Sequence, residues 1–137
     1  MRTSLAFRAI VAAGLIALPG MASAQWRAVN RSEVFPISKG VFEVVNRSSS
    51  RTQDYWCAAG DYAITQLRTA ATQRIYVSVP IGASQFRSGK RGVRFSLTPP
   101  PEGPAPDSYS LSVKKVGENL TAASARNYCY DDLFLDF

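Results

Sequence analysis

The sequence contains no histidine, and this absence excludes more functions than any other feature of its 137 residues. Histidine is the commonest general base, a frequent metal ligand and the side chain that changes charge near neutral pH. Its absence excludes the Ser/His/Asp and Cys/His hydrolases, the HExxH zinc enzymes and His-ligated haem. Methionine is also scarce, since the chain holds only Met1 and Met21. We expect no bound cofactor and no metal site.

The chain also lacks an apolar segment of the roughly 20 residues that a membrane-spanning helix needs. An apolar run over residues 9–18 follows a basic start and ends at a Pro-Gly pair. Residues 22–24, Ala-Ser-Ala, then match the small residues of a signal-peptidase site. We expect residues 1–24 to be a cleaved signal peptide rather than a permanent anchor, with an exported mature chain that begins at Gln25 and has no transmembrane span.

Cysteine occurs twice, as Cys57 and Cys129, which are 72 positions apart. An even number of cysteines in an exported chain predicts a structural disulfide. For a loop of this length the chain-entropy estimate of its stabilisation is roughly 4 kcal/mol. The alternative, a nucleophilic or metal-bound thiolate, lacks both a histidine partner and CxxC spacing. The two cysteines are therefore predicted to form a disulfide.

A main helix is predicted between two stretches of strand-like sequence. Residues 41–45, Val-Phe-Glu-Val-Val, are β-branched or bulky and are bounded by turn residues, which indicates a strand. Ser50 with Gln53 three positions later is a capping-box pattern, and apolar residues at helical spacing follow it. We expect a helix over residues 52–68. Gly60 inside this helix suggests close packing against another backbone segment.

Alternation of apolar and polar residues predicts the remaining strands. Residues 75–79 and 93–97 are expected to pair as an antiparallel hairpin around a long loop, residues 81–92. A further strand is expected at 109–113, and a short helix at 120–128. We therefore predict an α+β fold in which one main helix packs on a small antiparallel sheet of three to four strands, with one disulfide.

Proline is concentrated in one segment, because residues 99–106 hold five of the eight prolines. Such a segment is stiff and extended and cannot join a central strand. We interpret it as a surface connection within a single domain, residues 25–137, rather than as a ligand for a proline-recognising domain.

Charge is distributed unevenly along the expected mature chain, whose net charge is +4 once Arg2 and Arg8 are removed. Residues 25–94 hold 11 basic and 4 acidic side chains, whereas residues 95–137 hold 3 basic and 6 acidic ones. This asymmetry predicts that one part of the molecule attracts anions.

Four cations lie close together within residues 86–95, around a glycine-containing loop. They are the candidate anion-binding residues: Arg87, Lys90, Arg91 and Arg94. Such a loop can bind an anionic envelope component or an acidic protein. The alternative is a solvated loop whose charges prevent pairing between sheet edges. Nucleic acid is not an expected partner, because export separates the protein from it.

Two carboxylates on the predicted helix provide the alternative function, a small cell-wall hydrolase that uses them with an exposed tyrosine. Asp54 and Asp61 are seven positions apart and would lie about 10.5 Å apart along the helix axis. That separation is near the upper limit for inverting glycosidases. Two acids at this spacing are more typical of a solvated helix face, so we assign no catalytic residue and expect a non-enzymatic binding or structural module.

Three segments carry a resemblance to known proteins. Phe42-Glu43-Val44-Val45, the segment Tyr55–Ala63 and the segment Thr72–Val77 are similar to small exported proteins of alphaproteobacteria, a group without an assigned activity. The resemblance covers roughly residues 41–80. It implies a periplasmic or secreted location in a Gram-negative bacterium, and it adds no catalytic residue.

Overall fold

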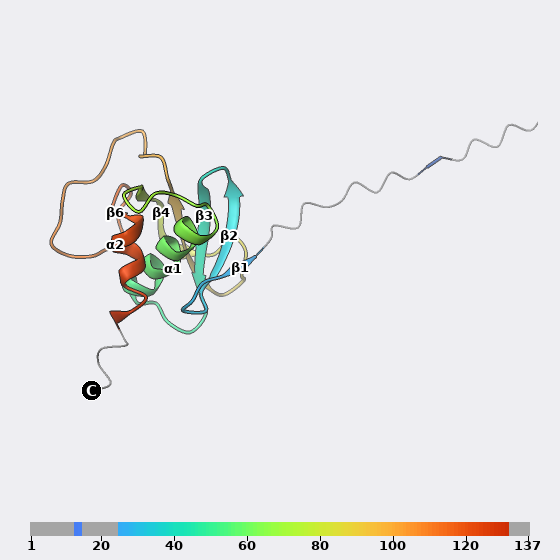
Figure 1. Ribbon diagram of the computed structural model, residues 1–137. Coiled ribbons are helices and arrows are strands. Elements are labelled where there is room, and N and C mark those ends of the chain that lie inside the picture. Colours follow the sequence, from blue (N-terminus) through green and yellow to red (C-terminus); the bar gives the residue numbers. More distant parts are fainter. Residues whose placement is uncertain (1–12, 15–24, 132–137) are drawn as a thin grey trace, which may run out of the picture.

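The computed structural model describes residues 13–14 and 25–131 and has an α+β fold (Figure 1). Most of the predicted signal peptide, including the expected cleavage site after residue 24, lies outside the described residues, as do residues 132–137 of the predicted domain. Among the described residues, no helix has the length and apolar character needed to cross a membrane.

One antiparallel sheet of six strands supports two helices. The strand order is β1-β2-β3-β5-β4-β6, so β5 pairs with β3 although α1 and β4 separate them in the chain. The elements are β1 (Trp26–Arg27), β2 (Glu33–Ser38), β3 (Val41–Asn46), α1 (Thr52–Thr65), β4 (Arg74–Ala83), β5 (Arg91–Ser96), β6 (Asn119–Thr121) and α2 (Ala122–Asn127).

The α+β class is confirmed, but the predicted number of strands was too small. β1 has two residues and β6 has three, so neither is long enough to show alternation. β2 was missed because Glu33 and Pro36 interrupt its apolar pattern, although Glu33 is fully buried. The segment 109–113 is not a strand, but Val113 is buried and its carbonyl accepts the N–H of Ile81 at 2.9 Å.

The core lies between the sheet and α1. Because side chains alternate along a strand, one face of β3, β5 and β4 is apolar and packs against the helix. Trp56 meets Phe95 edge-on at 5.0 Å between ring centroids, and Phe42 meets Tyr62 at 4.7 Å. The sheet contributes Val34, Phe42, Val44, Ile75, Val77, Val93 and Phe95 to this cluster.

Helix α1 ends three residues earlier than predicted and is buried over a wide part of its surface. Arg68, just beyond it, has a positive φ of 54°, a conformation that cannot continue a right-handed helix. Arg51 rather than Ser50 precedes the first turn, and it makes no side-chain capping bond. The close packing predicted at Gly60 is confirmed, because an added Cβ would lie 2.8 Å from the carbonyl oxygen of Ala122 in α2.

The predicted disulfide is confirmed and joins the two helical segments. Cys57 in α1 is bonded to Cys129, which follows α2, with 4.7 Å between their Cα atoms. The bond therefore ties the C-terminal part of the described chain to the first turns of the main helix, beside which α2 lies (α2 and α1 in Figure 1).

The β4–β5 loop, residues 84–90, covers the sheet face opposite α1. The sequence predicted a loop over 81–92, but β4 continues to Ala83 and β5 begins at Arg91. The ring of Phe86 stacks on Phe35 of β2 with 4.6 Å between centroids. This loop is thus packed on the sheet rather than extended into solvent.

Candidate anion-binding site

A shallow pocket of about 270 Å³ forms where the turn after β3 meets the end of the β4–β5 loop. Its lining includes three cations and no carboxylate. The lining residues are Asn46, Arg47, Ser48, Ser49, Ser50, Tyr55, Gly89, Lys90 and Arg91. In the following text this cavity is called the basic pocket.

The first wall of the basic pocket is the polar turn that ends β3. The side-chain oxygen of Asn46 accepts hydrogen bonds from the N–H groups of Ser48 and Ser49, at 3.0 and 2.8 Å. This is the way in which asparagine stabilises a turn. The amide group of Asn46 also donates to the buried Ser32 hydroxyl at 3.0 Å. Both the oxygen and the nitrogen of the Asn46 side chain therefore hold the turn that carries Arg47 in place.

The second wall comes from the start of β5. Arg91 lies opposite Asn46 in the β3–β5 register, so strand pairing brings the two walls together. The carbonyl of Lys90 accepts the N–H of Ser84 at 2.8 Å, which closes the β4–β5 loop. The Tyr55 hydroxyl donates to the carbonyl of Arg91 at 3.5 Å, and burial raises the pKa of this tyrosine, so it remains a neutral donor.

Arg87, a predicted anion-binding residue, does not line this pocket. Its guanidinium donates two hydrogen bonds to one carboxylate oxygen of Glu33, from Nε at 3.0 Å and from Nη2 at 2.6 Å. It also lies over the ring of Phe35, 5.3 Å from the centroid. The hydrogen bond to Glu33 raises the pKa of Arg87 further. This cation fastens the loop to the sheet.

Arg94 also lies outside the basic pocket. Its side chain points to the face of the sheet that the β4–β5 loop covers, which is called the covered face below. Its guanidinium donates to the side-chain carbonyl of Gln85 in the β4–β5 loop. It lies opposite Glu43 in the β3–β5 register. Burial raises the pKa of Glu43, while hydrogen bonds from Gln85 and Ser84 and the charge of Arg94 oppose that shift.

The structure thus brings two of the four predicted residues, Lys90 and Arg91, to the pocket and adds a third cation. Sequence reasoning missed Arg47, which lies 43 positions before Lys90. A basic residue inside an Asn-Arg-Ser-Ser-Ser turn was visible in the sequence. The β3–β5 pairing that places this turn beside the loop was not.

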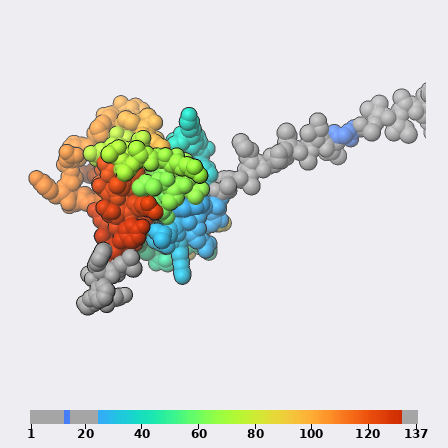
Figure 2. Space-filling view, viewed as in Figure 1, coloured from blue at the N-terminus to red at the C-terminus, as the bar shows by residue number. Residues whose placement is uncertain are grey.

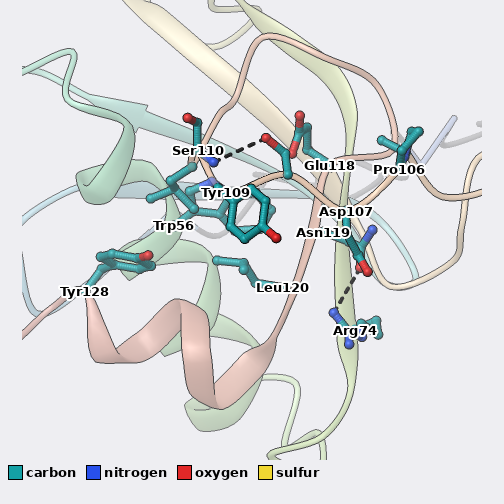
Figure 3. Close-up of a pocket in the computed structure, with 13 residues that line it drawn as sticks. Trp56, Arg74, Pro106, Asp107, Tyr109, Ser110, Glu118, Asn119, Leu120 and Tyr128 are labelled. Carbon is teal, nitrogen blue, oxygen red and sulfur yellow. Dashed lines mark hydrogen bonds between the residues drawn. The ribbon is translucent and has the colours of Figure 1, made fainter.

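The two carboxylates of the hydrolase hypothesis each have a structural partner. The Asp61 carboxylate accepts the N–H of Val29 at 3.0 Å and pairs with Arg126 at 3.5 Å. Asp54 pairs with Arg51 at 3.0 Å on the helix surface. Neither aspartate lines the basic pocket or the pocket shown in Figure 3.

A second pocket, of about 250 Å³, has the opposite electrical character (Figure 3). Asp107 and Glu118 line it together with the rings of Trp56, Tyr109 and Tyr128. The single cation in its lining is Arg74, whose guanidinium donates a hydrogen bond to the side-chain oxygen of Asn119 at 3.1 Å.

One wall of this second pocket has little support from the rest of the domain. Residues 106–110 are all exposed, and the ring of Tyr109 is fully exposed. The segment is tied at its start by a 2.9 Å bond from the N–H of Ala105 to the carbonyl of Gly117. A site here would have one poorly fixed side, whereas both walls of the basic pocket are hydrogen-bonded.

No protein family, curated protein or solved structure matches this chain. Among the described residues, no group of three or more His, Cys, Asp or Glu side chains could hold a metal ion. The functional inference accordingly depends on the chemistry of the two pockets.

Proposed function

We propose that this protein is a non-enzymatic binding module that takes phosphate groups of the cell envelope in the basic pocket. The observation that carries the proposal is the convergence of Arg47, Lys90 and Arg91 on one pocket with no acidic lining. These cations come from two segments that are distant in sequence, so their proximity is a product of the fold.

The residue types suit a phosphate ester. Guanidinium groups bind phosphate oxygens through paired hydrogen bonds, and a lysine adds a compact positive charge. Ser48 and Ser50 also line the pocket and carry hydroxyl groups. At physiological ionic strength charge attraction is screened beyond about 8 Å, so the anion must reach the pocket itself. Binding should therefore weaken as salt is added.

Export to the periplasm or the secreted fraction is the second part of the proposal. Its supports are the signal-like residues 1–24 and the disulfide between Cys57 and Cys129, since disulfides persist in oxidising compartments. The resemblance to exported alphaproteobacterial proteins agrees with this location. The surfaces of that compartment carry lipid and glycan phosphates that an exported cationic module can reach.

The test is cosedimentation of residues 25–137 with vesicles of phosphatidylglycerol and phosphatidylcholine, alongside vesicles of phosphatidylcholine alone. We expect binding to the anionic vesicles only, with loss in the double variant Lys90→Glu/Arg91→Glu. The matched control, Lys114→Glu/Lys115→Glu, makes the same change of charge at two exposed residues outside the pocket. Each cation close to an anionic membrane contributes about 1 kcal/mol, so a nonspecific effect would appear equally in both variants.

Two further probes separate the sources of the anion. Inorganic phosphate tests the pocket without a membrane, and soluble polyglutamate tests an acidic polypeptide. Saturable binding of phosphate with loss in Lys90→Glu/Arg91→Glu supports the proposal. Equal loss of vesicle binding in both double variants, or binding of polyglutamate without binding of phosphate or vesicles, would overturn it.

A further inference from the structure

A buried carboxylate lies behind the basic pocket and faces an arginine from each side. Glu33 of β2 is fully buried. Its Oε2 accepts the two hydrogen bonds from Arg87, and its Oε1 lies 3.6 Å from Nε of Arg47. Arg87 belongs to the β4–β5 loop and Arg47 to the turn after β3. One side chain therefore contacts both segments that form the pocket walls.

We propose that Glu33 is the positioning residue of the basic pocket, fixing the loop wall through Arg87 and leaving Arg47 able to turn from Glu33 to a bound anion. This inference rests on the proposed function, because it assigns a role within the same site.

The contacts of the two arginines with Glu33 differ in strength. Arg87 makes two hydrogen bonds, stacks over Phe35 and donates a further bond to the side-chain carbonyl of Gln25 at 2.9 Å. Arg47 makes only a long ionic contact, its side chain is 60% exposed, and Oε1 of Glu33 has no hydrogen-bond partner. The contacts of Arg87 hold the loop in place, whereas Arg47 can leave Glu33 and bind an anion instead.

The exchange leaves no buried charge without a partner. If Arg47 turns to an anion in the pocket, Glu33 keeps both hydrogen bonds from Arg87. A buried carboxylate that lost its last cation would carry a large penalty, so this second partner is what permits the movement. Lys90 and Arg91 follow Arg87 by three and four residues and stay in place with it.

Positioning and simple electrostatics predict opposite results for Glu33→Gln. Removing the negative charge that pairs with Arg47, one of the pocket's three cations, should tighten anion binding if charge alone matters. If Glu33 positions the loop wall, the same variant releases Arg87 and weakens binding. The sign of the change therefore distinguishes the two roles.

Glu43 offers a matched control on the same covered face. It is also buried, and its carboxylate accepts the N–H of Gln85 in the same loop at 3.3 Å. Glu43 does not line the basic pocket, and in the described part of the chain no ion pair or hydrogen bond joins its side chain to the pocket's three cations. Glu43→Gln removes one buried negative charge without releasing Arg87.

The experiment titrates inorganic phosphate into ¹⁵N-labelled residues 25–137 and follows the amide shifts of Lys90 and Arg91. We expect Glu33→Gln to raise the Kd about tenfold, which corresponds to the loss of roughly one charge-assisted contact. Arg87→Lys, which keeps the charge but loses the paired geometry, should weaken binding in the same direction, and Glu43→Gln should leave the Kd within about twofold. Hydrogen exchange of residues 86–90, beyond the two loop residues that contact Glu43, should accelerate in the first two variants and not in the third.

The outcomes are distinct. Unchanged or tighter binding by Glu33→Gln would overturn the positioning role while leaving the proposed function intact, as would unchanged exchange in the loop. A wild-type protein that does not bind phosphate or anionic vesicles would overturn both. Should Glu33→Gln fail to fold, Arg87→Lys decides the question, because weaker binding supports the role and an unchanged Kd contradicts it.

Discussion

The two longest strand connections that contain no helix differ in what holds them. In the β4–β5 loop, residues 84–90, the ring of Phe86 stacks on Phe35 of β2, and Arg87 is hydrogen-bonded to Glu33 of the same strand. The connection from β5 to β6, residues 97–118, contains the five clustered prolines and arches away from the domain (Figure 1; orange in Figure 2). The first is held by side-chain contacts with the sheet. The second is attached near its end, where Val113 is buried and its carbonyl accepts the N–H of Ile81, but residues 99–110 are mostly exposed and depend largely on the stiffness of their own backbone.

This difference explains why the basic pocket is the stronger candidate site. A binding site needs side chains that are already held near their bound positions, because ordering them on binding costs affinity. The first loop supplies cations whose backbone is fixed by Ser84, Arg87 and strand pairing. The second supplies Asp107 and Tyr109 on an exposed arm. The prolines limit the conformations of this exposed segment, but they do not attach it to the rest of the second pocket.

The largest expected effect comes from removing the disulfide that ties the segment after α2, downstream of the second connection, to α1. The variant Cys57→Ser/Cys129→Ser should lose about 2 to 5 kcal/mol in the free energy of unfolding, as for other small disulfide-bonded domains. α2 would lose its covalent tie to α1, while the covered sheet face keeps all its contacts. Urea unfolding measures the loss. Exchange that accelerates in residues 84–90 as much as in residues 119–128 would contradict the separation of the two regions.

The next effect should come from loosening the first loop. Phe86→Ala removes a partly buried ring and its stacking on Phe35, and should lower the free energy of unfolding by about 2 kcal/mol. The matched variant on the second connection, Tyr109→Ala, removes a fully exposed ring and should change stability by less than about 0.5 kcal/mol. Thermal unfolding of the two variants compares them directly. Similar losses would show that the two connections are equally attached.

A smaller effect concerns the carboxylate under the first loop. Burial raises the pKa of Glu43 above its ordinary value of 4.5. The folded state therefore holds this proton more tightly than the unfolded state, and the associated stability is present below the ordinary pKa and lost as pH rises through the folded value. We expect wild-type stability to fall over that window relative to Glu43→Gln. Parallel curves of unfolding free energy against pH would show that Glu43 does not titrate abnormally.

The same contrast separates what was predictable from what was not. Strand β3, helix α1, the β4–β5 hairpin and the disulfide follow from local patterns of apolar residues, caps and cysteines. β2 could not be recognised, because the burial of Glu33 depends on a cation more than 50 residues later in the chain. Lys90 and Arg91 were identifiable as candidates from local charge. Their partner Arg47, and the use of Arg87 as a fastener, depend on non-local strand pairing.

The smallest expected effect tests whether the second connection is stiffened through its prolines. Pro101 lies on the exposed part of this connection, in a turn where the N–H of Gly103 donates to the carbonyl of Pro100 at 2.8 Å. Pro101→Ala should destabilise the protein by about 0.5 kcal/mol, because alanine gives the unfolded chain more conformations to lose.

No contact in the basic pocket should change in this variant, so its Kd for phosphate should equal that of the wild type. Differential scanning calorimetry should detect a fall of about 2 °C in Tm, given that 1 kcal/mol shifts a domain of this size by roughly 4 °C. A loss comparable to that of Phe86→Ala would instead mean that the proline segment packs on the domain. In that case the second connection, like the first, is held by contacts rather than by the restricted conformation of its backbone.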